Sequence, residues 1–153
     1  ELDYAFIPAE SITEDMIQLN LIFTENYGVL IPGGMELADR NFVTKEDIMS
    51  RFSSVPDTAQ VELQIMNWFD NELRDYGKCH SLAEQLMLSD NGISFNFVPM
   101  NIADLLNENR LCVVRLSPDI SVTTVAVKRK DAVVKSINIK FEEFLNSGEE
   151  YLR

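Results

Sequence analysis

Apolar residues in the first half of the chain recur every three or four positions, the spacing that places them on one face of a helix. Polar residues that suit helix starts stand just before each periodic stretch, and glycine or proline follows most of them. The pattern predicts helices over 11–27, 45–53, 57–76 and 81–89. Capping boxes in which Ser11 pairs with Glu14, and Ser81 with Glu84, support the first and the last of these.

After Gly92 the apolar period shortens to two, which is typical of a half-buried strand. Strands are predicted over 93–97, 111–116, 120–128 and 132–141, with short helices over 101–109 and 142–152. Because the last three strands are joined by short turns, they are predicted to form an antiparallel meander. The predicted fold class is α+β, with N-terminal helices packed on a small, mainly antiparallel C-terminal sheet, in a single domain over 1–153.

The charge of the chain narrows the classes of partner. There are 25 Asp and Glu against 13 Lys and Arg, a net charge of −12, which repels phosphate backbones and anionic lipids. Residues 1–91 carry the whole excess, with 17 acidic and 5 basic residues, and 1–39 contain no Lys or Arg. Direct nucleic-acid binding is therefore not expected, whereas a protein partner with a basic face is.

Other features exclude several kinds of site. The sequence has neither a phosphate-binding loop, nor a dinucleotide fingerprint, nor a paired-cysteine zinc motif, and one histidine cannot supply a two-imidazole site. No cofactor and no metal are expected. With two cysteines and no run of 18 apolar residues, a soluble protein in the cytoplasm, or delivered from it, is expected rather than a membrane-spanning or disulfide-stabilised one.

The segment Gly77-Lys78-Cys79-His80-Ser81 holds the candidate catalytic residues, Cys79 and His80. Cys79 precedes a capped helix and follows Lys78, and both the helix dipole and the lysine favour a thiolate. A glycine two residues before a cysteine at a helix start, with the alternating segment 122–127 much later, resembles papain-like cysteine hydrolases. The resemblance implies Cys79 as nucleophile. It departs from those enzymes because the late sheet lacks their histidine, so general-base activation of the thiol is lost.

We interpret the chain as a non-enzymatic protein-interaction domain of the immunity, chaperone or effector-module kind. It would bind its partner through an acidic helical face, and this hypothesis needs no residue that the sequence lacks. The alternative is a papain-like cysteine hydrolase or transferase, or its inactive descendant, with Cys79 as nucleophile. A third hypothesis is a DNA mimic that inhibits a nucleic-acid-binding protein. The identity of the partner and the oligomeric state stay open.

Overall fold

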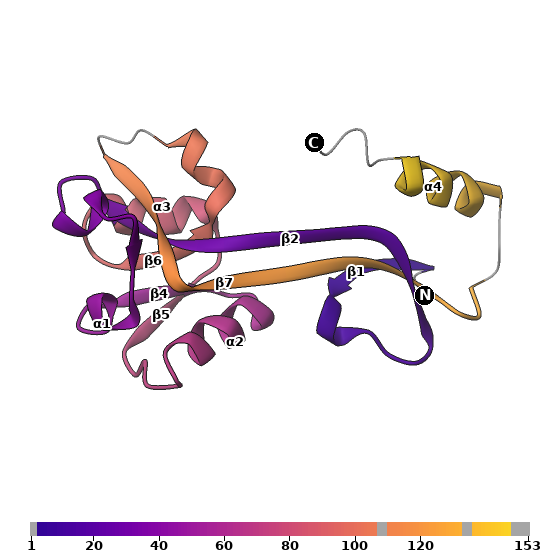
Figure 1. Cartoon of the computed structure of the whole chain (residues 1–153), viewed down its shortest axis with the longest axis horizontal. Coiled ribbons are helices and arrows are strands. Elements are labelled where there is room, and N and C mark those ends of the chain that lie inside the picture. The colour runs from indigo at the N-terminus through magenta and orange to yellow at the C-terminus, as the bar shows by residue number, and fades with distance from the viewer. Residues whose placement is uncertain (1–2, 107–109, 133–135, 148–153) are drawn as a thin grey trace. The chain divides into compact units, whose positions relative to one another are not determined.

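The computed structural model describes residues 3–106, 110–132 and 136–147 and divides into two compact units. The central unit comprises residues 25–122, and the terminal unit comprises residues 1–24 and 123–153. Two long strands, β2 (Met16–Pro32) and β7 (Leu111–Arg129), contribute residues to both units (Figure 1). Because the units share these strands, the division does not test the predicted single domain, which stays a prediction.

Parallel pairing around one strand organises the central unit. Its shorter strands are β3 (Phe42–Val43), β4 (Ser53–Pro56), β5 (Tyr76–Cys79) and β6 (Phe95–Pro99). β4 has β5 on one side and β6 on the other, and both neighbours run parallel to it. β6 also pairs antiparallel with β2, and β3 pairs parallel with β7. The sheet is therefore mixed.

The helices of this unit connect the parallel strands or follow their ends. They are α1 (Lys45–Ile48), α2 (Ala59–Trp68) and α3 (Leu82–Asp90), with the 3-10 helices η2 (Glu36–Asp39) and η3 (Met100–Leu105). Parallel strands cannot be joined by a tight turn, so α2 carries the chain from β4 to β5 and α3 carries it from β5 to β6. Figure 1 shows α2 and α3 on opposite faces of the sheet.

Aromatic rings form the centre of the core between α2 and the sheet. Trp68, Phe69 and Phe97 pack edge to face, with ring centroids 4.8 to 6.4 Å apart. The Trp68 indole nitrogen donates to the carbonyl oxygen of Pro118 at 2.7 Å, so its polar atom is satisfied although the ring is buried. Trp68 therefore belongs to the core.

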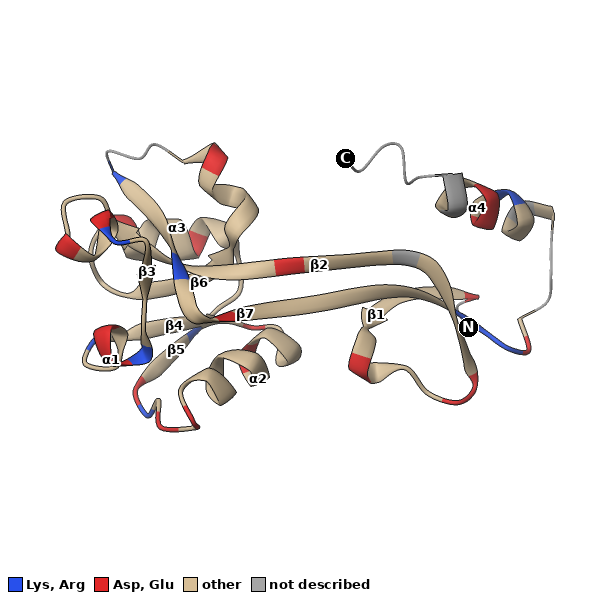
Figure 2. Cartoon of the chain, viewed as in Figure 1, with Lys and Arg blue, Asp and Glu red and all other residues tan. Residues whose placement is uncertain are grey.

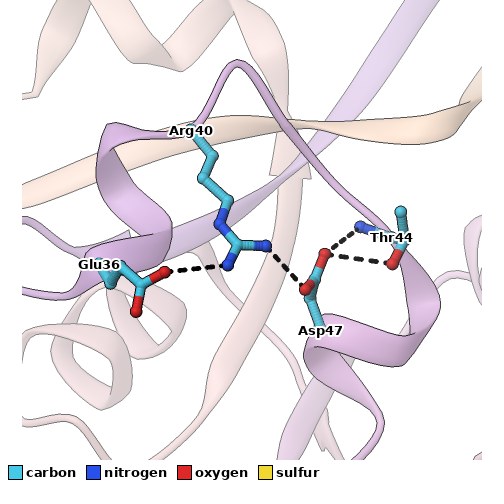
Figure 3. Close-up of polar contacts among 4 residues, drawn as sticks. All are labelled: Glu36, Arg40, Thr44 and Asp47. Carbon is cyan, nitrogen blue, oxygen red and sulfur yellow. Dashed lines mark hydrogen bonds and ion pairs between the residues drawn. The ribbon is translucent and has the colours of Figure 1, made fainter.

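A carboxylate fixes the start of α1. The backbone amide and the hydroxyl of Thr44 donate to Asp47 Oδ2 at 2.9 and 3.1 Å (Figure 3). Arg40 donates to Asp47 at 2.8 Å and to Glu36 at 3.0 Å, which ties η2 to α1. The hydrogen bond from the Thr44 backbone is the main reason that the pKa of Asp47 is lowered. These side chains therefore fix the connection between η2 and α1.

The terminal unit contains β1 (Tyr4–Pro8), η1 (Ala9–Ser11) and α4 (Ser136–Ser147) besides residues of β2 and β7. β1 pairs antiparallel with β7, with Tyr4 opposite Lys128. The Tyr4 hydroxyl donates to Glu142 at 2.6 Å, and Lys128 Nζ lies 2.9 Å from the same carboxylate. The Tyr4 ring also packs edge to face on Phe141, at 5.1 Å between centroids. These contacts attach α4 to the strands.

The predicted fold class is wrong. The sheet is mixed rather than mainly antiparallel, its strands come from the whole length of the chain, and β2 occupies most of the first predicted helix. Apolar residues stand at so many positions of β2 that a spacing of three or four can be found there without being the true period. Val29, Leu30 and Ile31 are all fully buried, as in a strand covered on both faces.

Several predicted boundaries are also corrected. The helix over 57–76 ends at Trp68, because Asp70 and Asn71 adopt left-handed φ angles of 53° and 60°, and β5 then begins at Tyr76. The predicted meander is wrong, since its first two strands are one strand, β7, and α4 replaces its last strand from Ser136 onward. Parts of the predicted elements fall at 107–109, 133–135 and 148–152, outside the described residues. The helix predicted at 81–89 is confirmed as α3.

Candidate functional site

The winding of the central sheet reverses at β4. From β4 the chain passes through α2 to β5 on one side, and then through α3 to β6 on the other side of β4. Open α/β sheets bind ligands outside the carboxyl ends of their strands, at the point where the winding reverses. The reversal lies between β4 and β6, so Asp57 and Thr58, which follow β4, stand at this crevice. His80 and Ser81 follow the neighbouring strand β5 at the same edge, where His80 contacts Asp57. These four residues form the candidate site.

The start of α2 presents hydrogen-bond donors at this edge. Thr58 is the N-cap residue, and its side chain makes no capping hydrogen bond. The Thr58 amide donates to the Pro56 oxygen at 2.8 Å and the Asp57 amide donates to the Cys79 oxygen at 2.9 Å, which joins the ends of β4 and β5. The first amides of a helix lack partners within the helix and carry partial positive charge. The edge can therefore donate to an acceptor group.

Acidic and basic side chains that contact each other line the same edge. His80 Nδ1 lies 3.1 Å from Asp57 Oδ2, and Lys78 Nζ lies 3.6 Å from Asp57 Oδ1. Lys78 also donates to Glu62 at 2.7 Å, and the Tyr76 hydroxyl donates to Glu62 at 3.1 Å. The Lys78 hydrogen bond is the largest cause of the lowered pKa of Glu62. The Asp57 carboxylate and the His80 ring, with 71% of the His80 side chain exposed, are accessible from solvent.

Cys79 lies on the opposite side of its strand from this row. It is 3% exposed, and its thiol donates to Asn96 Oδ1 at 3.5 Å. Asn96 in turn donates to Ser89 and Ser94, and Ser54 donates to Ser94, so that a buried polar layer separates the sheet from α3. Burial is the largest cause of the raised pKa of Cys79.

The two predicted catalytic residues thus have different partners. Successive strand residues point to opposite faces, so the Lys78 ammonium reaches Glu62 and Asp57 instead of the Cys79 thiol. The His80 ring pairs with Asp57, while Cys79 pairs with Asn96. A catalytic role for Cys79 and His80 stays a prediction, and the raised pKa of Cys79 works against the thiolate that it requires.

Sequence reasoning missed Asp57 and Thr58 as site residues because it placed them only at the start of the predicted helix over 57–76. The signal that could have found them is a repeated order of short strand, capping residue and helix. It occurs at 53–68 and again at 76–90, and two such units in succession indicate parallel strands whose carboxyl ends meet at one edge.

Within the ranges that the structure describes, no group of three or more His, Cys, Asp or Glu side chains is placed to hold a metal ion. No described helix is long and apolar enough to cross a membrane.

No protein-family model and no curated protein matches this sequence. Solved structures do match. The PA01 protein of Pseudomonas aeruginosa, provisionally assigned to the LysR family of transcriptional regulators, has a TM-score of 0.76 at 15% identity over 97% of this chain. The MetR regulatory domain from N. meningitidis, also of the LysR family, has a TM-score of 0.74 at 14% identity over 97% of this chain. The fold is that of a LysR regulatory domain.

Another regulator of the same family, HinK from P. aeruginosa, has a TM-score of 0.72 at 14% identity over 95% of this chain. The chain spans 54% of the PA01 protein and 52% of HinK, about half of each, and 71% of the MetR regulatory domain. At these identities the LysR likeness establishes the fold alone.

The LysR-like fold corrects the functional interpretation. The interaction domain of the immunity, chaperone or effector-module kind is wrong, and so are the papain-like and DNA-mimic alternatives, because the fold matches that of LysR regulatory domains. The acidic helical face is also wrong, since β1 and all of β2 lie in the base-free segment 1–39. Figure 2 shows few charged residues on β2 or β7. A protein partner with a basic face has no support.

Proposed function

We propose that the chain is the ligand-sensing part of a transcriptional regulator of the LysR type. It binds a small polar molecule at the edge where β4 and β5 end, and another part of the regulator contacts DNA. The observation that carries this proposal is the reversed winding at β4, which opens the edge beside the uncapped start of α2. The similarity of the fold to regulatory domains of such regulators supports it.

The chemistry of the edge indicates what the ligand carries. The first amides of α2 can donate to an acceptor group of a ligand, and the exposed Asp57 carboxylate, beside His80 and Lys78, can accept from a donor group. A ligand with both groups would satisfy the edge without displacing the contact between the Asp57 amide and the Cys79 oxygen. The net charge of −12 agrees with a chain that leaves DNA binding to another part. A regulator of transcription also acts where DNA is, which agrees with the expected cytoplasmic location.

Thermal unfolding in the presence of small polar metabolites tests the proposal. A ligand at about 100 times its Kd stabilises a protein by about 2.7 kcal/mol, which raises the Tm of a chain of this size by about 5–10 °C. We expect Asp57→Ala to weaken binding of the active compound by about tenfold, because a hydrogen bond to a charged group is lost.

Asp119→Ala is the matched control. Asp119 is as exposed as Asp57, at 46% against 45% of the side chain, and it also pairs with a basic residue, Arg115. The control should bind with the affinity of the unmodified chain. Equal loss in both variants, or no loss in Asp57→Ala, would show that the ligand binds elsewhere and would refute the proposed site.

A further inference from the structure

Two arginines in the acidic part of the chain have no carboxylate partner. Residues 1–91 hold 17 acidic and 5 basic residues. Three of the five basic residues form ion pairs with carboxylates, namely Arg40, Lys45 and Lys78. The other two, Arg51 and Arg74, form no ion pair with any described residue. Because acidic residues outnumber basic ones threefold in this part, two guanidinium groups without a carboxylate require an explanation.

Both arginines line one hollow of about 490 Å³ in the central unit. Its walls are residues 49–52, which lead into β4, and residues 72–75, which lead into β5. The hollow therefore lies at the amino ends of these parallel strands, whereas the candidate site lies at their carboxyl ends. Small-molecule sites occupy about 300–1,000 Å³, so the hollow is large enough for one. We call it the amino-end hollow.

The Arg51 guanidinium is held against an aromatic ring. Its Cζ atom lies 5.4 Å from the centre of the Phe95 ring, and Phe95 is buried. A guanidinium group stacked on an aromatic face keeps its N–H groups at its edge, where they match the two oxygens of a carboxylate. Arg51 is therefore positioned to bind a carboxylate, although the described part of the chain supplies none to it.

The amino-end hollow also contains carboxylates without a basic partner. Glu72 and Asp75 line it, and neither forms an ion pair within the ranges that the structure describes. Figure 2 shows both signs of charge on the segment between α2 and β5. Two apolar side chains of the same hollow, Met49 and Phe52, are exposed. The hollow thus presents charges of both signs, which are not joined to each other, beside apolar surface.

We propose that the amino-end hollow binds a free α-amino acid with an apolar side chain. The carboxylate of the amino acid pairs with the two arginines, its ammonium group pairs with a carboxylate of residues 72–75, and its side chain covers Met49 and Phe52. A simple anion would be repelled by Glu72 and Asp75, and a simple cation by the arginines. The site is separate from the proposed ligand edge, because its residues precede β4 and β5 instead of following them.

An NMR titration of the isotope-labelled chain with L-leucine, L-methionine and L-phenylalanine tests the proposal. We expect at least one of them to shift the amide signals of residues 49–52 and 72–75 to saturation. Its N-acetyl derivative lacks the ammonium charge, and its amide derivative lacks the carboxylate. Each derivative should bind about tenfold more weakly or worse, because charge-assisted hydrogen bonds are lost. Derivatives that bind as well as the amino acid would overturn the proposal.

Arg74→Gln removes one positive charge from the wall and should weaken binding of the same amino acid by about tenfold. Arg115→Gln is the matched control, since Arg115 is also an exposed arginine and lies outside the hollow. Circular dichroism should show that both variants remain folded, because both side chains are exposed. Equal affinities in the two variants would overturn the proposal.

The positions of the shifted signals separate this proposal from the proposed function. Shifts centred on residues 57–58 and 80–81 would place the amino acid at the candidate site. That result would overturn a site in the amino-end hollow and would support the proposed function. If none of the three amino acids binds, the amino-end hollow is not such a site, and the proposed function is unaffected.

Discussion

Gly28 marks a place where the backbone of β2 approaches its neighbours too closely for a side chain. A Cβ atom there would lie 2.5 Å from Met100 Sδ, 2.7 Å from Val113 Cγ1 and 2.8 Å from the Val114 carbonyl oxygen. The side chains can shift, but the carbonyl belongs to the backbone of β7. We expect Gly28→Ala to lower the free energy of unfolding by about 1–3 kcal/mol, measured by urea denaturation.

Gly34→Ala provides the comparison for this substitution, because a Cβ atom on Gly34 would meet nothing within 4 Å. Its urea midpoint should match that of the unmodified chain or exceed it slightly, since alanine restricts the unfolded chain more than glycine does. Equal midpoints for the two variants would contradict the close approach at Gly28.

The sequence indicated where Cys79 lies along the chain better than it indicated the chemistry of its thiol. Cys79 does stand shortly before a capped helix, as the sequence indicates, yet it is the last residue of a strand. Strand geometry sends Lys78 and Cys79 to opposite faces, so the lysine cannot lower the pKa of the thiol as expected. Which face is buried depends on the packing of α3, and adjacent residues alone do not encode that packing.

At the scale of elements, α4 depends on a titratable contact that predicts a change of stability with pH. The pKa of Tyr4 is raised to about 12, through burial first and then through its hydrogen bond to Glu142. A raised pKa favours the protonated hydroxyl in the folded chain. The contribution of Tyr4 is thus complete below pH 10, the ordinary pKa, and is lost as the pH rises toward 12. We expect the urea midpoint to fall over this range.

Tyr4→Phe isolates this effect because it keeps the ring packed on Phe141 and removes the hydroxyl. Other tyrosines and lysines titrate in both proteins, so the difference between their urea midpoints reports on Tyr4. That difference should be largest below pH 10 and should shrink as the pH approaches 12. A gap that stays constant across the range would count against the Tyr4 to Glu142 contact as a source of stability.

Elements with local signals were predicted better than elements that depend on distant partners. The Ser81 hydroxyl accepts from the Glu84 amide at 3.2 Å, as the predicted capping box requires, and Glu84 returns a contact to the His80 amide. By contrast, β5 is four residues long and is held by β4. A strand this short shows no detectable hydrophobic period. Its pairing within the sheet decides its conformation, although the sequence pattern favours a helix there.

For the whole molecule, the fold class required knowing which distant strands pair. Short strands separated by helices indicate parallel crossovers only when β4 and β5 are recognised as strands, and the extended helical assignment over 57–76 concealed β5. The overall charge was more informative. An excess of 12 acidic residues over basic ones argues against a broad basic surface. Charge alone could not distinguish a LysR-like fold from the fold of a protein-docking module.

The same charge excess predicts how salt affects folding. Raising NaCl from about 0.01 M to about 0.1 M shortens the screening length from about 30 Å to about 10 Å, which weakens repulsion across the molecule more than contacts at short range. Exposed ion pairs such as Arg115–Asp119 contribute little each, on the order of 0.2–1 kcal/mol. With a net charge of −12, relief of repulsion should prevail, and the urea midpoint should rise with salt. A midpoint that falls instead would mean that ion pairs outweigh the repulsion.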